Sequence, residues 1–545
     1  MGIEYDRPFL QKPSEETLHP ILRDRARLAQ YILDDAESLT IPEYVPPSLH
    51  PHAADQPISL TPFDEFDSMK IAIPPDESIK GWEILYKNNL ELANSPSRIE
   101  AMMAVEERGF TPPPKLPNGA IDKAVDEGII LELPDLGHLR QLSNFGENET
   151  YLTRIAELIR ESKNGILAPA LLQEIEKFAT EQESIKQAHR TDLLATGPFS
   201  FSGKYVGSFV GLGAMPSIGG SVLALETAAK MYMTAHVPEV GYFSDITKQA
   251  ALAGAVLERL NGNDPLLGGR DPREKDFMLK HWRSYITGVL EVNPKKALKR
   301  AGKLAEVGVT SFRIYGHTHG GDILTTLRLL RNEYPDANIN ASQISSIEMA
   351  LACEYYGANS ITAGVGGGGA CLTGQRSDYL PENAVLAWKL RGLLGIPLLC
   401  EGGGIDNPVN AILVGFSGVN GSGSIGGGTF EAPGGVFFFT KDGRKFLKRY
   451  AGEASDSTKW ESGRTYSTGT SYFQEGSQSF KELKPVRESM TENILKHWER
   501  IILGAVVLGV DDGPFTISAM QNINPSPLFR KSQSGTLVQG LHTLY

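Results

Sequence analysis

The stretch SYITGVLEVNPKKALKRAGKLAEVGVTSFRIY, from Ser284 to Tyr315, decides the expected fold. Its first part, Ser284–Glu291, is an apolar and β-branched run that predicts a strand. A helix is expected over Asn293–Glu306, because leucines and alanines recur on one face of that segment. Gly308 then supplies a left-handed helix end, and Thr310–Tyr315 predicts the next strand. Strand, helix and strand in this order indicate a parallel βαβ unit.

The same alternation recurs on both sides of this stretch. Helices are expected at Asp322–Asn332 and up to Tyr355, the second opened by a capping box of Ser345 with Glu348. Strands and further units are expected near Tyr205–Leu212, Val240–Phe243, Asn338–Gln343, Ser360–Val365, Glu382–Leu394, Ile396–Glu401 and Pro408–Phe416. The tally approaches eight strands, which favours an α/β fold with a closed (β/α)8, or TIM, barrel. In such barrels the chemistry lies in loops after the carboxyl ends of the strands.

Composition limits the classes of function. The chain has 545 residues, 41% hydrophobic and 22% charged, which is enough for a large core and more than one unit. Its formal net charge of -12 argues against nucleic acid as a partner, because nucleic-acid binders gather basic residues. Three cysteines are too few for a disulfide framework and favour a reducing compartment. We therefore expect a cytoplasmic protein with no targeting segment and no membrane span.

The first third of the chain differs from the rest. Prolines interrupt residues 42–62 and 112–117, and helices are expected at Leu22–Asp35, Ile99–Glu107 and Leu152–Glu161. We expect residues 1–195 to form a mostly helical, proline-punctuated N-terminal extension, whose simplest role is packing or assembly. The barrel is assigned to residues 196–515, and residues 516–545 are a C-terminal tail.

One loop stands out chemically. The segment GVGGGGACLTG, Gly364–Gly374, directly follows a predicted strand. Four successive glycines allow main-chain groups to wrap an anion or a monovalent cation. Cys371 ends that run, where backbone N–H groups would stabilise a nucleophilic thiolate. A small buried cysteine beside a tight turn is the alternative interpretation.

Four ordered blocks resemble a known family. Gly366, Gly368, Cys371 and Thr373 fall on the spacing G-x-G-S-x-C-x-T. The later blocks are GSIGGGTFEAPGG from Gly423, KRYAGEAS over residues 448–455, and Glu475 with Gly476. In order and spacing they resemble the IMP dehydrogenase and GMP reductase family. The resemblance covers about residues 200–513. The family's usual regulatory module, which is inserted between early barrel units, is not expected in this chain, because only residues 261–279 could be an insertion at that place.

The resemblance implies an NAD- or NADP-dependent oxidoreductase acting on a purine or related nucleotide through a covalent cysteine adduct. The implied catalytic residues are Cys371, Thr373, Arg464 and Tyr466, the last two in a mobile flap over residues 451–474. Thr465 separates Arg464 from Tyr466, and a solvated polar loop is the alternative for this pair. The family also implies a homotetramer.

Binding roles follow from the same resemblance. Glu401 takes the place of the family's ribose-binding aspartate, and Gly403, Gly423, Ser424 and Tyr450 match its phosphate contacts, with barrel turn geometry as the alternative for the glycines. The further implied residues are Gly452, Glu453, Ala454 and Glu475 for substrate, Gly364, Gly366 and Glu431 for the cofactor, and Gly366, Gly368 and Cys371 for a backbone K+ site. Helix capping is the alternative for Glu431.

Departures from the family pattern leave other functions open. Gly369 replaces the phosphate-loop serine, and Gly316 stands in place of an aspartate in the loop GHTHGGD. His317 and His319 with Asp322 form a conceivable metal group, although ordinary polar loop histidines are the simpler interpretation. The alternatives are a catalytically altered nucleotide-binding or assembly paralogue, and a barrel enzyme acting on a different substrate.

The flap gives a direct test. If Arg464 activates water as the resemblance implies, Arg464→Ala slows hydrolysis of the adduct more than hydride transfer. We expect a burst of reduced cofactor followed by slow turnover in a stopped-flow absorbance experiment. Wild-type steady-state turnover in this variant would instead make Arg464 a solvated loop residue, with Tyr466 or Lys459 as the next candidates.

Overall fold

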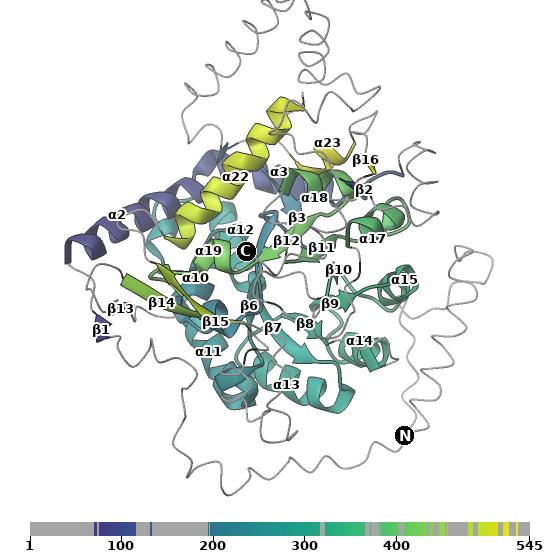
Figure 1. Cartoon of the computed structure of the whole chain (residues 1–545), viewed down its shortest axis with the longest axis horizontal. Coiled ribbons are helices and arrows are strands. Elements are labelled where there is room, and N and C mark those ends of the chain that lie inside the picture. The colour runs from purple at the N-terminus through teal and green to yellow at the C-terminus, as the bar shows by residue number, and fades with distance from the viewer. Residues whose placement is uncertain are drawn as a thin grey trace, which may run out of the picture.

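The computed structural model describes residues 70–72, 76–115, 131–132, 194–195, 197–316, 322–365, 371, 381, 383–402, 408–432, 437–439, 446–452, 455, 478–482, 489–508, 510, 516–522 and 530–531. Within them, eight parallel strands close into a barrel through the pairing of β12 with β5. Figure 1 labels β6 to β12 around this barrel. The expected (β/α)8 barrel is confirmed. The strands are β5 (Val210–Leu212), β6 (Ala235–Val237), β7 (Ile286–Glu291), β8 (Ser311–Tyr315), β9 (Asn338–Ile344), β10 (Ser360–Ala363), β11 (Leu398–Glu401) and β12 (Gly418–Gly421).

Helices cover the outside of the barrel (Figure 1). The main ones are α10 (Val222–Lys230), α11 (Ile246–Arg259), α12 (Pro272–Tyr285), α13 (Pro294–Glu306), α14 (Asp322–Glu333), α15 (Ile347–Tyr355), α17 (Asn383–Leu390), α18 (Pro408–Val414) and α22 (Met490–Val507). Local chemistry sets the bounds of α13, because the Asn293 side chain accepts the N–H of Lys296 at 3.1 Å and Pro294 is its first residue. Gly308 follows with a φ of 97°, as expected. None of the described helices is both long and apolar enough to span a bilayer.

Three sequence-based expectations about local structure were wrong in position. The second barrel strand is β6, and the segment expected near Val240–Phe243 instead contains a 3-10 turn over Gly241–Ser244. The strand expected from Ser284 begins at Ile286, because α12 continues to Tyr285. The N-cap of α15 is Ser346, one residue after the expected Ser345, and its side chain accepts the N–H of Met349.

The interior of this barrel is polar. Arg313 on β8 contacts His236 on β6 and Glu401 on β11, which are not neighbouring strands, so these side chains point inward. Residues two positions apart on a strand share a face. On β9, inward Asn338, Asn340 and Ser342 therefore alternate with outward Ile339 and Ala341. Most apolar strand residues pack against the helices, whereas polar residues make up much of the barrel interior.

Inside the barrel these polar groups bond to one another. The Asn340 amide donates to the Ser360 hydroxyl at 2.8 Å, and the Thr362 hydroxyl donates to the Asn340 amide oxygen at 3.0 Å. Such pairing removes the penalty of burying unsatisfied polar atoms.

Part of the N-terminal extension packs onto the barrel. It contains α2 (Asp76–Ala93) and α3 (Pro96–Arg108), and α3 confirms the helix expected at Ile99–Glu107. The helices expected at Leu22–Asp35 and Leu152–Glu161 lie outside the described residues. The Asn89 amide on α2 donates to the Thr491 hydroxyl on α22 at 3.2 Å.

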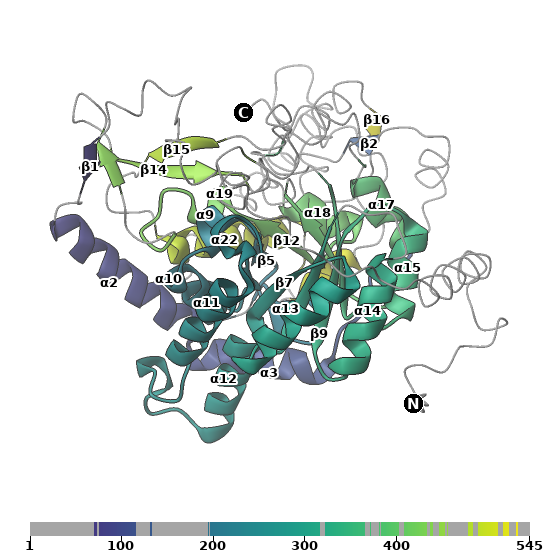
Figure 2. The ribbon, with the colours of Figure 1, turned by 90° about the horizontal axis from the view of Figure 1, so that it is seen from below.

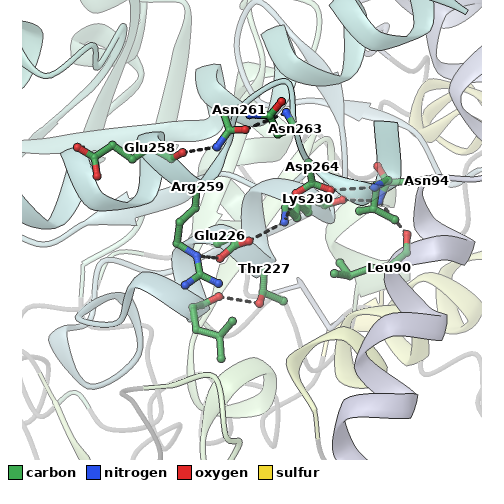
Figure 3. Close-up of polar contacts among 12 residues, drawn as sticks. Leu90, Asn94, Glu226, Thr227, Lys230, Glu258, Arg259, Asn261, Asn263 and Asp264 are labelled. Atoms are coloured by element: carbon green, nitrogen blue, oxygen red, sulfur yellow. Dashed lines mark hydrogen bonds and ion pairs between the residues drawn. The ribbon is translucent and has the colours of Figure 1, made fainter. Parts of the chain in front are cut away.

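Asn94, between α2 and α3, anchors this extension. Its side-chain nitrogen donates to the carbonyl oxygens of Leu90 at 2.8 Å and Lys230 at 3.0 Å (Figure 3). Its side-chain oxygen accepts from the Tyr232 hydroxyl at 2.9 Å. The Lys230 ammonium is buried between carboxylates on α10 and on the loop before α12. Its nitrogen lies 2.6 Å from Glu226 and 2.5 Å from Asp264 (Figure 3).

A second sheet stands at one end of the barrel, and α3 lies toward the other end (Figure 2). Its strand order is β1-β13-β14-β15, and its members are β1 (Lys70–Ala72), β13 (Phe437–Phe439), β14 (Phe446–Ala451) and β15 (Gln478–Glu482). β1 comes from the extension and pairs antiparallel with β13. β14 and β15 pair over five residues and flank the segment expected to be the flap.

Removing the Asn94 side chain tests the docking of the extension. Asn94→Ala leaves the Lys230 carbonyl and the Tyr232 hydroxyl buried without these partners, so we expect a loss of about 2–4 kcal/mol in the free energy of unfolding. Urea denaturation followed by circular dichroism measures it. Asn263→Ala, in an exposed loop nearby, is the control and should change stability by less than about 0.5 kcal/mol. A loss below about 1 kcal/mol for Asn94→Ala would contradict the anchoring role.

Candidate active site

Loops from β10, β11 and β12 begin at the same end of the barrel, because all eight strands are parallel. β10 continues into Gly364, β11 ends at Glu401, and β12 leads into α19 (Gly423–Gly426). Gly364 has a φ of 116°, and a Cβ there would lie 2.8 Å from the Asn383 amide nitrogen and 3.2 Å from the Glu401 carbonyl. Glycine is therefore required where the cysteine loop leaves its strand.

The three cysteines differ in exposure. Cys353 on α15 and Cys400 on β11 are buried, whereas Cys371 is half-buried. Burial raises the pKa of the Cys353 thiol to about 12, which keeps it protonated and unreactive at neutral pH. Cys371 is therefore the accessible thiol of this chain.

Glu401 occupies the barrel mouth with a fixed partner. Its carboxylate pairs with the guanidinium of Arg313, which is fully buried, while 22% of the Glu401 side chain is exposed. The same oxygen, Oε2, accepts from Arg313 Nη2 and from the Asn420 amide, the latter at 3.2 Å. Arg313 Nε also donates to the Ser342 hydroxyl at 3.0 Å, so the arginine is held from two sides.

His236 completes the buried part of this network. Burial, followed by the charge of Arg313, holds the pKa of His236 well below its ordinary value, so its ring is neutral. Nδ1 contacts the Leu212 carbonyl and lies 3.3 Å from Arg313 Nη1. A proton on Nδ1 is donated to Leu212, and in that tautomer the nitrogen does not accept from the arginine.

The residues expected to hold phosphate are brought together by β14. The hydroxyl oxygen of Tyr450 on β14 accepts a hydrogen bond from the backbone of Gly423, and the hydroxyl donates to Met215 Sδ at 3.2 Å. Burial raises the pKa of Tyr450, so its hydroxyl stays protonated. Ser424 follows Gly423 in α19, and Gly452, directly after β14, is buried. The Ser217 hydroxyl donates to the Ala451 carbonyl at 2.7 Å and fixes this end of β14.

Glu431 lies below the surface. Its side chain is fully buried, and Oε1 accepts the N–H of Met490 at the start of α22 at 2.8 Å. This geometry fits the alternative role of Glu431, which is helix capping. Contact of Glu431 with a cofactor stays a prediction. Burial raises the pKa of Glu431 to about 7 and lowers that of Lys448 to about 8, and the lysine donates to the Thr429 carbonyl at 2.9 Å.

Several predicted residues lie outside the described part of the chain. They are Thr373, Arg464, Tyr466, Gly403, Glu453, Ala454, Glu475, Gly366, Gly368, His317 and His319. Their roles, including the backbone K+ site, stay predictions. Within the described residues, no group of three or more His, Cys, Asp or Glu side chains is arranged to hold a metal ion.

Three residues at this end of the barrel were missed from the sequence. They are Arg313, Gln343 and Asn383. Gln343 has a φ of 59°, which is unfavourable for a side-chain-bearing residue, where the pairing of β9 with β10 shifts register. Its Oε1 and the Oδ1 of Asn383 are buried and meet no donor among the described residues. In the sequence, the charge of Arg313 inside a predicted strand could have marked it as a site residue. Nothing in the sequence indicates the positive φ of Gln343.

A cavity of about 890 Å³ lies away from the strand ends. It is formed between α2 and the loop before α12, and Tyr86, Leu90, Lys230 and Leu266 are among its lining residues. Since it borders no strand end, it does not belong to the candidate active site.

The raised pKa of Glu431 predicts a pH dependence of stability. The folded state binds a proton between the ordinary value of 4.5 and about 7, so stability falls as pH rises through that window. Relative to Glu431→Gln, which keeps the acceptor for Met490, the wild type should lose about 2–4 kcal/mol between pH 5 and pH 7.5. Urea denaturation of both proteins at the two pH values measures this. Parallel profiles would contradict the raised pKa.

Comparison with known proteins places this geometry in a family. The IMP dehydrogenase / GMP reductase domain matches residues 168–520, beginning before residue 196, where the barrel unit was expected to start. An inosine-5'-monophosphate dehydrogenase of Nitrosopumilus maritimus (strain SCM1) is 31% identical over 164 residues, 29% of this chain and 34% of that protein. That of Pasteurella multocida (strain Pm70) is 32% identical over 163 residues, 29% of this chain and 33% of that protein.

A GMP reductase of Lactobacillus gasseri is 29% identical over 151 residues, 26% of this chain and 43% of that protein. The chain thus spans about a third of the dehydrogenases and less than half of this reductase. The family match itself extends over well more than half of the 545 residues. The chain therefore belongs to the IMP dehydrogenase / GMP reductase family.

Proposed function

We propose that this chain is an NAD(P)-dependent oxidoreductase that acts on a purine or closely related nucleotide through a covalent adduct on Cys371. The observation that carries the proposal is the position of Cys371, the accessible thiol, in the loop after β10. Family membership and the Glu401 carboxylate at the end of the next strand support it.

The reaction needs a nucleophile that can also act as a leaving group. In the oxidative direction, the Cys371 sulfur forms a bond to C2 of the purine, and C2 loses its hydrogen as a hydride. When bound, the nicotinamide supplies the two-electron acceptor or donor. Water then attacks C2, the C–S bond breaks with its electron pair returning to sulfur, and Thr373, Arg464 and Tyr466 assist in this step. In the reductive direction ammonia leaves C2 and hydride arrives.

In this proposal, the substrate is bound at its ribose and at its phosphate. Glu401 accepts hydrogen bonds from the ribose hydroxyls, and Gly403, Gly423, Ser424 and Tyr450 bind the phosphate. Gly452, Glu453, Ala454 and Glu475 line the remainder. Backbone N–H groups and a neutral tyrosine hydroxyl are suitable donors for a phosphate, and burial keeps Tyr450 in that form.

The mouth also suits a ligand that brings N–H donors. Asn383 Oδ1 and Gln343 Oε1 are buried acceptors with no donor among the described residues, and the Asn383 amide lies against Gly364. A nicotinamide carboxamide carries such donors. Gly364 and Gly366 complete the proposed cofactor contacts, and the carbonyls of Gly366, Gly368 and Cys371 bind K+.

We also propose that the protein is a cytoplasmic homotetramer with small-molecule partners. Light scattering at micromolar concentration tests the assembly, and a monomer would contradict it.

Replacing the thiol tests the reaction. With IMP and NAD+, or GMP and NADPH, we expect turnover followed by cofactor absorbance, and Cys371→Ser should reduce kcat at least about a thousandfold while nucleotide binding persists. Mass spectrometry of the quenched wild type should show a nucleotide adduct on Cys371. Cys353→Ser is the matched control and should leave kcat within about threefold, because that thiol is remote and protonated.

The outcomes separate the alternatives. Nucleotide binding without turnover in the wild type would identify a binding or assembly paralogue. Full turnover in Cys371→Ser would remove covalent catalysis and indicate a barrel enzyme of another type.

A further inference from the structure

We propose that Arg313 is a positioning residue that fixes Glu401, so that the barrel mouth selects ribonucleotides over 2′-deoxyribonucleotides. The inference rests on the proposed function, in which Glu401 receives the sugar. Neither the motifs of the sequence nor the family comparison assigns a role to Arg313.

The guanidinium of Arg313 is held in one place. It reaches from β8 across the interior, and its side chain has no exposed surface. Nε donates to the Ser342 hydroxyl at 3.0 Å, Nη2 donates to Glu401, and the ring of Tyr315 lies 4.9 Å from the guanidinium carbon. A planar fork with contacts on β8, β9 and β11 cannot turn to follow a moving carboxylate. The carboxylate must therefore adopt the orientation that the arginine sets.

The two oxygens of Glu401 are used differently. Oε2 accepts from both Arg313 and Asn420. Oε1 meets no donor among the described residues, and the side chain is 22% exposed at the strand end. One oxygen is thus anchored inside the barrel, and the other faces the mouth.

Gly213 leaves room beside the outer oxygen. A Cβ at this position would lie 3.5 Å from Glu401 Oε1 and only 2.4 Å from the Ser422 hydroxyl. A Cβ would collide with the Ser422 hydroxyl and would make an ordinary van der Waals contact with Oε1, so glycine leaves the space beside both oxygens free of its own side chain. The arrangement therefore keeps a single carboxylate oxygen open to a ligand.

An anchored carboxylate oxygen is a specific acceptor for sugar hydroxyls. It has two lone pairs, which match two vicinal hydroxyls of a ribose, whereas a 2′-deoxyribose offers one hydroxyl fewer. A hydrogen bond to a charged acceptor changes affinity by about tenfold to a hundredfold. Arg313 also balances the negative charge of Glu401, which would otherwise repel an anionic nucleotide.

Calorimetric titration of the full chain tests the proposal without turnover. The probes are IMP and 2′-deoxy-IMP, and the readout is the ratio of their dissociation constants. The wild type should prefer IMP by about tenfold to a hundredfold. Arg313→Met should bring the ratio to about one to three, mainly by weakening IMP. Arg313→Lys restores the charge and one donor, and should recover part of the preference.

Arg391→Met is the matched control. Arg391 is as deeply buried, but its side chain donates to the carbonyls of Pro114, Leu413 and Gln521 and not to Glu401. Replacing Arg391 should lower the melting temperature but keep the wild-type ratio of the dissociation constants of IMP and 2′-deoxy-IMP. Circular dichroism confirms folding, and Arg313→Gln, which keeps a polar group near Ser342, is used if Arg313→Met does not fold.

Two results would overturn the inference in distinguishable ways. If Arg313→Met or Arg313→Gln binds IMP tightly and keeps the wild-type ratio of the two dissociation constants, Arg313 has no positioning role. The proposed function would then still stand. Absence of binding of either nucleotide to the wild type removes both proposals. A ratio lost equally in Arg391→Met would show a general effect of destabilisation, and it also counts against Arg313.

Discussion

Closure of the barrel is the constraint on which the rest of the structure depends. When β12 pairs with β5, none of the eight barrel strands retains a free edge, and the loops after β10, β11 and β12 begin at one end. Closure also creates an interior that side chains must fill. Here polar residues occupy much of it, and Arg313 extends from β8 across this interior to Glu401 on β11.

A buried arginine shapes its surroundings. A buried guanidinium requires a carboxylate and acceptors for its remaining N–H groups. Glu401, Ser342 and the neutral ring of His236 surround it. The same charge that requires Glu401 inside the barrel leaves one oxygen of that glutamate at the mouth. The side chain of Glu401 therefore both neutralises the buried arginine and offers an acceptor to a ligand.

Local chemistry predicted much of the fold. The helix over Pro294–Glu306 and the left-handed Gly308 follow from side-chain periodicity and backbone freedom. The three-residue β6 was misplaced, because so short a strand has no periodicity of its own. For the site, the sequence nominated Cys371 by motif spacing and Glu401 by its place at a strand end, and their roles stay predictions. The partnership of Arg313 with Glu401 joins residues 88 positions apart and depends on barrel closure, which no local pattern encodes.

The docking of the N-terminal extension has a kinetic consequence. Asn89 on α2 bonds to Thr491 on α22, 402 residues later, and β1 pairs with β13. During synthesis the extension leaves the ribosome before the barrel, but these two partners, α22 and β13, emerge only after all eight barrel strands. Loop-closure entropy delays such distant contacts relative to the neighbouring βα units. We therefore expect the contacts of the extension with α22 and β13 to form after the neighbouring βα units, whereas the contacts of Asn94 with Lys230 and Tyr232 need no later part of the chain.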